Sequence, residues 1–245
     1  MNDFYNRLPI NEIFVSIDGE VNDWGTGALT VFIRTQGCNL RCFYCDTTQS
    51  WNKESEKNPT TKEIADLVLS SGVNKVTITG GEPLLHTLPL ERLCLELNYY
   101  GINISIETNG TIPIPLRMSQ YPLRISWIVD YKNHSRTSVD EFAKVFEYCA
   151  YGGGTYWIKF LIEDRADFIA AMEIIQCLPK IVKVPLRFAL SPIQGKDPMD
   201  TVTADELLYW IVVEMKQKEY SQPISINTQL HKLIFPAGEK NHILL

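Results

Sequence analysis

The sequence predicts an α/β protein in which parallel strands form a sheet or a partial barrel with helices outside it. Two observations indicate this class: short apolar runs rich in β-branched residues alternate with segments of helical period, and they do so along the whole chain. The strands are too few for an eight-stranded barrel, which favours the partial barrel. No repeat, low-complexity tract or linker divides the 245 residues, so we expect one domain spanning 1–245.

The expected strands are short runs of β-branched and aromatic residues. They cover residues 12–17, 29–35, 75–79, 102–107, 125–130, 156–162 and 186–191. The expected helices carry apolar residues at helical spacing. They cover residues 60–71, 88–100, 138–150, 165–177 and 203–218. Two of them begin with capping signals, "PTTKEIADL" and "VTADELL", in which a threonine precedes acidic residues.

Charge and apolar pattern argue against several classes of protein. The net charge of −6 and the pI of about 5.3 are atypical of a chain that binds nucleic acid or an anionic membrane directly. No apolar run approaches the roughly 20 residues of a membrane span. The start of the chain, "MNDFYNRLPINE", lacks the basic and apolar regions of a secretory signal. We therefore expect a cytoplasmic protein without a nucleic-acid or membrane partner.

Unusual polar clusters repeatedly follow the expected strands. They are "TGGEP" after 75–79, "ETNG" after 104–106, "DYK" after 127–129 and "SPIQGK" after 187–190. Parallel barrels build their active sites at the carboxyl ends of their strands. We therefore expect the four clusters to meet at one rim and to form a site.

The stretch "GCNLRCFYCDTT" carries three cysteines in a C-x3-C-x2-C pattern, Cys38, Cys42 and Cys45. A structural zinc site needs a fourth ligand, which would have to come from one of the four distant histidines. A 4Fe–4S cluster held by three cysteines instead leaves one iron open to another ligand. Spacing alone leaves both possibilities open.

The other three cysteines fall within expected amphipathic helices and not in a polar loop. They are Cys94, Cys149 and Cys177. Free cysteine is among the most buried residue types. We expect these three to be inert core residues, and the lack of a secretory context argues against disulfides.

The cysteine pattern, followed downstream by a strand and "GGEP", resembles the radical S-adenosylmethionine (SAM) superfamily. This resemblance implies a 4Fe–4S cluster whose open iron binds SAM and whose electron cleaves it to a 5′-deoxyadenosyl radical. Glycines in "GGEP" would let the backbone approach the ligand closely.

Nearly the whole chain is similar to one family of that superfamily, the 7-carboxy-7-deazaguanine synthases of deazapurine (queuosine and related) biosynthesis. The similarity is carried by "INEIFVSIDGE", "VFIRTQGCNLRCFYCDT", "VTITGGEP", "IETNG", "DYK", "LSPIQGK" and "TQLHKLIF". It implies a contracted barrel of roughly β6/α3 type, commonly as a homodimer. It also implies a lyase that rearranges 6-carboxy-5,6,7,8-tetrahydropterin to 7-carboxy-7-deazaguanine and ammonia, using SAM catalytically and Mg2+. A flavodoxin or ferredoxin is the reducing partner expected by analogy.

The resemblance implies roles for individual residues, and the radical itself would be delivered by SAM and not by a side chain. Cluster ligands would be Cys38, Cys42 and Cys45, and Thr47 would bind Mg2+. SAM contacts would come from Tyr44, Asp46, Gly80, Gly81, Glu82, Glu107, Asn109, Asp130, Tyr131, Lys132, Ser191, Pro192, Ile193 and Gln194. Substrate contacts would come from Ile17, Asp18, Gly19, Glu20, Arg34, Thr79 and His231.

Three features depart from the common family pattern. "SIDGEV" stands where many members have "SIQGEG", so Asp18 replaces an amide and Val21 a glycine. An ionised carboxylate only accepts hydrogen bonds, and pterin edges donate them, so Asp18 is chemically compatible with a pterin. Because many members have the amide at this position, we expect Asp18→Gln to be tolerated. "DYK" replaces "SPK", and the chain continues beyond His231 where some members end.

Two other functions stay open at this level. The first is another small radical SAM enzyme, such as an activase that makes a glycyl radical on a partner protein. The second is a non-enzymatic metal-binding module holding zinc or a cluster. Arg34 and Thr47, together with "SIDGE", favour the small-molecule enzyme over both.

Overall fold

The computed structural model describes most of the chain. The described residues are 6–52, 54–55, 57–120, 123, 125–132, 137–149, 154–193, 202–218, 220, 222–228, 230, 234 and 243–245. No helix among them is long and apolar enough to cross a membrane. Gln194 and His231, both predicted to belong to the site, lie outside these residues.

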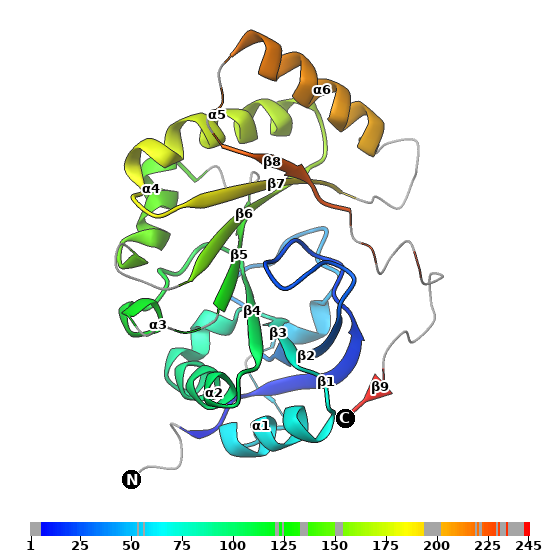
Figure 1. The fold of residues 1–245 in the computed structure, drawn as a ribbon, viewed down its shortest axis with the longest axis vertical. Coiled ribbons are helices and arrows are strands. Elements are labelled where there is room, and N and C mark those ends of the chain that lie inside the picture. Colours follow the sequence, from blue (N-terminus) through cyan, green and yellow to red (C-terminus); the bar gives the residue numbers. More distant parts are fainter. Residues whose placement is uncertain are drawn as a thin grey trace.

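A single nine-stranded sheet forms the centre of the fold, in the order β8-β7-β6-β5-β4-β3-β2-β1-β9 (Figure 1). Neighbours from β2 to β8 are parallel, whereas β1 pairs antiparallel with both β2 and β9. The bounds are β1 Ile10–Ile17, β2 Leu29–Thr35, β3 Lys75–Gly80, β4 Asn103–Thr108, β5 Ile125–Tyr131, β6 Thr155–Ile162, β7 Leu186–Pro192, β8 Ile224–Ile226 and β9 Ile243–Leu244. The predicted α/β class is confirmed, and the sheet is mostly parallel; the predicted strand 12–17, which is β1, is the exception because it pairs antiparallel. Within the described residues the sheet curves without closing, since β8 and β9 are its two ends.

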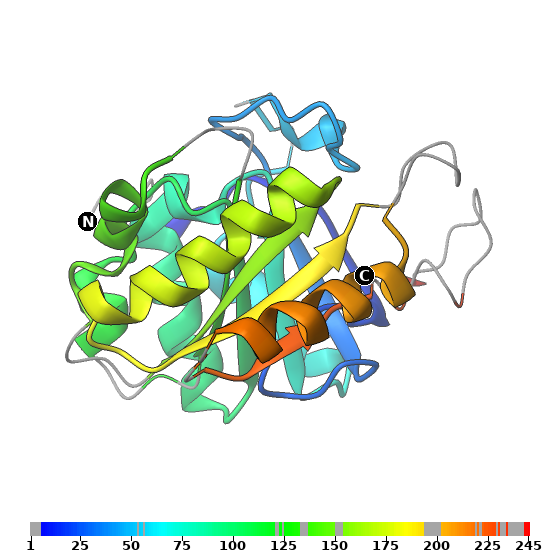
Figure 2. The same ribbon diagram turned by 90° about the horizontal axis from the view of Figure 1, so that it is seen from above.

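The helices lie along the outer side of this curved sheet (Figures 1 and 2). They are α1 Thr61–Ser70, α2 Thr87–Tyr99, α3 Leu116–Gln120, α4 Val139–Ala143, α5 Arg165–Ile181 and α6 Ala204–Gln217. Both predicted capping signals are confirmed, because Thr60 and Glu63 form a capping box at α1, and Thr203 and Glu206 form one at α6. Such boxes satisfy the backbone N–H groups that a helix start leaves unpaired.

The predicted helix 138–150 is wrong in its length. The α-helix ends at Ala143, and a 3-10 turn, Lys144–Phe146, continues it. The buried residues Phe142, Val145 and Phe146 explain the error. Their spacing suits one face of an α-helix, but i and i+3 also share a face in a 3-10 helix, so apolar spacing cannot separate the two.

The two faces of the parallel strands differ in chemistry. Side chains alternate between faces along a strand. Val31, Ile33, Val76 and Ile78 belong to the buried apolar core on the helix side, as do alternate residues of the strands that follow. The residues between them are largely polar, and the register sets Arg34 beside Thr79, Thr77 beside Ser105 and Asp130 beside Lys159. The concave face is therefore a polar wall.

The connection between β1 and β2, residues 18–28, folds into the curve of the sheet and covers the amino ends of its strands (dark blue in Figure 1). Trp24 donates from Nε1 to the Ile104 carbonyl at 2.9 Å. Asp23 accepts from Trp157 Nε1 at 2.8 Å and pairs with Arg187. These contacts reach β4, β6 and β7, so they fix this loop against the polar wall. We call residues 18–28 the plug loop.

Candidate functional site

A cavity of about 630 Å3 opens at the carboxyl ends of the parallel strands. Residues of all four strand-end clusters line it, as do the cysteine loop and the plug loop. The predicted site residues on its wall are Asp18, Gly19, Glu20, Arg34, Cys38, Cys42, Tyr44, Cys45, Asp46, Thr47, Thr79, Gly80, Gly81, Glu107, Asn109, Asp130, Lys132, Pro192 and Ile193. Ile17, Glu82, Tyr131 and Ser191 are described but do not line it. The fold thus brings most of the predicted residues to one place.

The cysteine loop follows β2 and projects beyond the strand ends, near the light-blue segment at the top of Figure 2. Its three thiols are free and half-buried. The Leu40 N–H donates to Cys38 Sγ at 3.4 Å, as backbone N–H groups do to cluster thiolates. Burial raises the pKa of Cys42, with Lys132 opposing the rise and Cys45 and Cys38 adding to it. All three sulfurs therefore belong to one local environment.

The donor set of this loop fits a 4Fe–4S cluster. Among the described residues, no group of three or more Cys, His, Asp and Glu side chains is placed to hold a single metal ion. A cluster distributes its thiolate ligands over several irons, so it does not require the sulfurs to converge on one point.

The "GGE" turn is shaped by the chain's own backbone. A Cβ on Gly81 would lie 1.9 Å from the Gly37 carbonyl oxygen, and one on Gly80 (φ +113°) would lie 2.4 Å from the Thr35 nitrogen. Both glycines are therefore needed for β3 to pass the end of β2, whatever ligand the turn meets. The close approach to a ligand that the sequence suggested for these glycines stays a prediction.

Glu82 is fully buried beneath this turn. It accepts hydrogen bonds from Leu84 N at 3.0 Å, Asn109 N at 2.7 Å and Thr108 Oγ1 at 2.8 Å. Burial raises its pKa, and these three bonds oppose the rise. The carboxylate thus joins the ends of β3 and β4 behind the cavity wall, and a direct SAM contact stays a prediction.

Asn109 holds the cysteine loop against the end of β4. Its Nδ2 donates to Asn39 Oδ1 at 2.8 Å and lies 4.0 Å from Cys38 Sγ. Its Oδ1 accepts from the backbone and the hydroxyl of Thr111 at 3.0 and 2.6 Å. Asn109, which is predicted to contact SAM, therefore fixes the cysteine loop to the end of β4.

Asp18 lies on the wall, but its carboxylate is already engaged. Oδ2 pairs with the buried Lys75 ammonium at 2.9 Å and accepts from Thr77 Oγ1 at 2.8 Å, while Oδ1 accepts from Glu20 N at 3.1 Å. Lys75 also donates to Asn22 and to the Gly25 carbonyl, both at 3.0 Å. Asp18 thus fixes the plug loop to β3, and its direct contact with a pterin stays a prediction.

A chain of charges crosses the cavity from the plug loop to β5. Glu20 pairs with Lys159 at 3.2 Å, and Lys159 pairs with Asp130 at 3.2 Å. Asp130 pairs with Lys132 at 2.5 Å, and the Lys132 ammonium lies 5.6 Å from the centre of the Tyr44 ring. Burial acts to raise the pKa of Asp130, but Lys132 and Lys159 outweigh it and lower the pKa.

Sequence reasoning missed Lys159 and Lys75, since both lie in runs read as plain apolar strands. One signal in the sequence could have identified them: each is a single lysine within a strand whose other residues are mostly apolar. Asn227 was also missed, although its Nδ2 donates to Glu20 Oε2 at 2.6 Å. It lies 207 residues away in sequence, and no local pattern indicates the contact.

Arg34 and Thr47 form the opposite part of the wall. Arg34 Nη1 donates to Thr47 Oγ1 at 2.8 Å, and Arg34 Nε lies 3.1 Å from Glu12 Oε1. The Thr47 hydroxyl donates to Asp46 Oδ1 at 2.9 Å. A guanidinium, a hydroxyl and a carboxylate are therefore adjacent at this edge of the cavity.

Glu107 lies on the inner face of β4 and accepts from Thr79 Oγ1 at 2.7 Å. Burial raises its pKa to about 7; Lys159 opposes the rise, and Glu20 and Asp18 add to it. Its electrostatic neighbours are thus residues predicted to bind substrate, although the family resemblance placed Glu107 with SAM.

The residues that do not reach the cavity have other contacts. Tyr131 points to the helix side, where its ring packs edge-on against Phe142. Ser191 is buried and accepts from Asn227 at 3.4 Å.

The three cysteines outside the cysteine loop were expected to be core residues. Cys94 and Cys149 are buried as expected, and burial raises the pKa of Cys149 to about 11. Cys177 differs from the expectation, because it is only half-buried.

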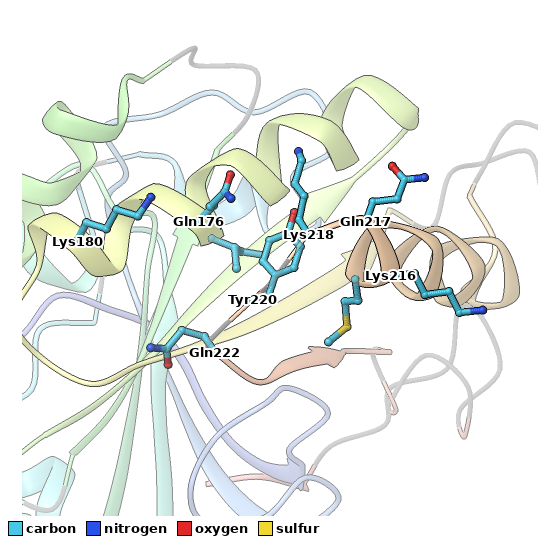
Figure 3. A pocket seen from close by; sticks show the side chains of 9 residues that line it. Gln176, Lys180, Lys216, Gln217, Lys218, Tyr220 and Gln222 are labelled. Atoms are coloured by element: carbon cyan, nitrogen blue, oxygen red, sulfur yellow. The ribbon is translucent and has the colours of Figure 1, made fainter.

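A second cavity, of about 650 Å3, lies between α5 and α6 (Figure 3). Lysines and glutamines surround it, among them Lys180, Lys216 and Lys218. Lys218 is paired with Glu214 at 2.9 Å. None of the predicted site residues lines this cavity, so the candidate site is the first one.

Comparisons with known proteins agree with this assignment. The family model of the radical SAM superfamily matches residues 32–170. A 7-carboxy-7-deazaguanine synthase from Clostridium acetobutylicum is 32% identical over 239 residues, which cover 96% of this chain and 99% of the relative. A relative of the same name from Hyperthermus butylicus is 34% identical over 174 residues, 68% of this chain and 73% of the relative.

Solved structures show the same fold. The crystal structure of QueE from Escherichia coli matches with a TM-score of 0.64 at 24% identity, covering 92% of this chain and 98% of that one. A radical SAM methyltransferase from Sphaerobacter thermophilus matches with a TM-score of 0.60 at 15% identity, covering 85% and 69%. With the two sequence relatives and the family model, they lead to one conclusion: this chain is an enzyme of the radical SAM superfamily and belongs, within it, to the family of 7-carboxy-7-deazaguanine synthases.

Proposed function

We propose that this enzyme converts 6-carboxy-5,6,7,8-tetrahydropterin to 7-carboxy-7-deazaguanine and ammonia, with Mg2+ assisting and SAM used catalytically. One observation carries the proposal. A single cavity joins the three-cysteine loop to buried carboxylates and to an arginine. The names of the relatives support the product.

The overall reaction balances without an added oxidant. The ammonia released accounts for the whole difference in composition between the tetrahydropterin and the deazaguanine. The hydrogen atom taken from C6 can therefore return to the product side, which regenerates SAM. A 4Fe–4S cluster held by Cys38, Cys42 and Cys45 and SAM would supply the deoxyadenosyl radical when bound. The chain's own residues would position the substrate and keep water out.

The charges of the wall suit the two ends of this substrate. Pterin ring edges present N–H donors, and the Glu20 and Glu107 carboxylates can accept from them. The substrate carboxylate suits the Arg34 guanidinium, because such pairs form strong charge-assisted bonds. We therefore assign Glu107 to the substrate and not to SAM, because its neighbours are Asp18 and Glu20.

Thr47 and Asp46 would hold Mg2+ beside the substrate carboxylate. Mg2+ prefers oxygen ligands and keeps several waters, so one or two protein oxygens suffice when the substrate supplies another. The Thr47 hydroxyl and an Asp46 oxygen lie 2.9 Å apart, which fits such a site. We also propose a one-electron reducing partner such as flavodoxin or ferredoxin, and a homodimer.

The direct test is anaerobic incubation of reconstituted enzyme with SAM, a reductant, Mg2+ and 6-carboxytetrahydropterin, followed by mass spectrometry. We expect 7-carboxy-7-deazaguanine in excess over 5′-deoxyadenosine, since SAM is regenerated. Cleavage of SAM that is unaffected by the pterin would instead favour the alternative, an activase acting on a partner protein. One zinc per chain without sulfide would contradict both.

A further inference from the structure

Lys159 occupies an unusual position for a lysine. It lies on the inner face of β6 with 6% of its surface exposed, on the wall of the cavity. Burial acts to lower its pKa, but Asp130, Glu20 and Glu107 outweigh burial and raise the pKa well above its ordinary value. The ammonium is therefore charged, and a buried charge persists only where partners compensate it.

The two ion-pair partners of Lys159 come from different parts of the cavity. Glu20 belongs to the plug loop and also accepts from Asn227. Asp130 is the penultimate residue of β5 and also pairs with Lys132, which lies over the ring of Tyr44 in the cysteine loop. One ammonium thus connects the part assigned to the pterin with the part assigned to SAM.

Among the described residues of the cavity wall, the other cations have partners of their own. Lys132 pairs with Asp130, and Arg34 contacts Glu12 and Thr47. Lys159 pairs with Glu20, and its charge opposes the raised pKa of Glu107. Without it, several buried carboxylates of like charge would repel one another, and carboxylates that become protonated or move apart are poorer acceptors.

We propose that Lys159 is a positioning residue that holds Glu20 and Asp130 in one fixed arrangement, so that a single ammonium supports binding of both the pterin and SAM. The part of this inference that concerns the pterin rests on the proposed function. The part that concerns SAM rests on membership of the radical SAM superfamily. It predicts a distinctive pattern: losing Lys159 weakens two ligands, whereas losing either carboxylate weakens one.

The test measures binding and not turnover. Reconstituted enzyme is titrated anaerobically with SAM and, separately, with 6-carboxypterin, an aromatic analogue that cannot undergo the reaction. Lys159→Met should weaken both ligands by about tenfold or more. Glu20→Gln should weaken the pterin while leaving SAM within about threefold, and Asp130→Asn should do the reverse.

Two controls separate positioning from general damage. Lys159→Arg keeps the charge and should retain both affinities within about threefold. Lys180→Met removes a lysine beside the α5–α6 cavity (Figure 3) and should change neither affinity. If Lys159→Met does not fold, Lys159→Gln is used with the same expectation.

The inference is overturned if the neutral variant unfolds cooperatively yet loses only one ligand or neither. It is also overturned if Lys159→Arg is as defective as the neutral variant. The proposed function fails separately if wild-type enzyme binds SAM but not the pterin. In that case the SAM affinities of the Lys159 and Asp130 variants still decide whether Lys159 supports SAM binding.

Discussion

The Asp18 carboxylate and the Lys75 ammonium form a 2.9 Å ion pair in which each side chain is only 2% exposed. This pair holds the plug loop to the first residue of β3. The carboxylate at position 18 therefore serves as the counter-charge of a buried lysine.

The pair reverses what the sequence alone suggests for Asp18→Gln. We now expect this substitution to lower the free energy of unfolding by about 3–5 kcal/mol, since it leaves Lys75 buried without a counter-charge. Chemical denaturation of wild type and variant measures the change. Asp66→Asn, which breaks the exposed Lys62–Asp66 pair, is the matched control and should leave the unfolding midpoint unchanged. A midpoint for Asp18→Gln equal to that of the control would contradict the assignment.

Substrate binding should depend on pH through Glu107. Its pKa is raised from 4.5 to about 7, so in the folded protein the carboxyl is protonated below about pH 7 and ionised above it. The ionised form accepts from pterin N–H groups with both oxygens and more strongly than the protonated form, and the affinity for 6-carboxypterin should therefore rise as pH increases through 7. Glu107→Gln should flatten this profile. A wild-type profile that stays flat would sink the assignment.

The same shift affects stability, with a sign fixed by linkage. The unfolded state loses this proton near pH 4.5, whereas the folded state keeps it to about 7. The stabilisation from Glu107 is therefore full below about pH 4.5 and declines as pH rises towards 7. Comparing wild type with Glu107→Gln across that range isolates this contribution, and Glu107→Gln should lack the decline.

Cys42→Ala should abolish the cluster. Reconstituted wild type is expected to carry about four irons per chain, as a 4Fe–4S centre does, and the variant should lose the iron and cleave no SAM. Cys177→Ala removes a half-buried thiol of α5 and should keep the iron. Iron and sulfide analysis with absorption spectra reads this out; retained turnover in Cys42→Ala would refute the ligand assignment.

Thr47→Ala should weaken the response to Mg2+ while leaving the cluster intact. The hydroxyl lost is the one that lies between Arg34 and Asp46. The neighbouring Thr48 is exposed, which makes Thr48→Ala the matched control. Product formation is measured across a Mg2+ titration at constant iron content. An identical Mg2+ response in the two variants would show that the metal binds elsewhere.

The strand runs of the sequence predicted the parallel sheet, because their apolar residues face the helices and leave a clear pattern. The strand β8 and the helix α3 were missed, since Ile224–Ile226 and Leu116–Gln120 are too short for any period to develop. The 3-10 turn after α4 was missed because its apolar spacing mimics an α-helix.

The site was predictable where its chemistry is local. The cysteine loop and the "GGE" turn are contiguous in sequence. The ion pairs of Lys159 with Glu20 and Asp130 could not be predicted, because they join the plug loop, β5 and β6, which meet only once the sheet has curved. A motif records neighbours in sequence, whereas these ion pairs depend on tertiary distance.

The two-faced strands have a consequence for how this fold can change. In β6, Ile158 and Phe160 belong to the core, whereas Lys159 between them belongs to the cavity. Odd and even positions of one strand are thus free to diverge independently: one set can acquire new ligand preferences while the other preserves folding. Insertion of a single residue would exchange the two sets, placing an ammonium among the helices and a phenyl ring in the cavity. Substitution, but not insertion, is the route by which such strands can gain new specificity.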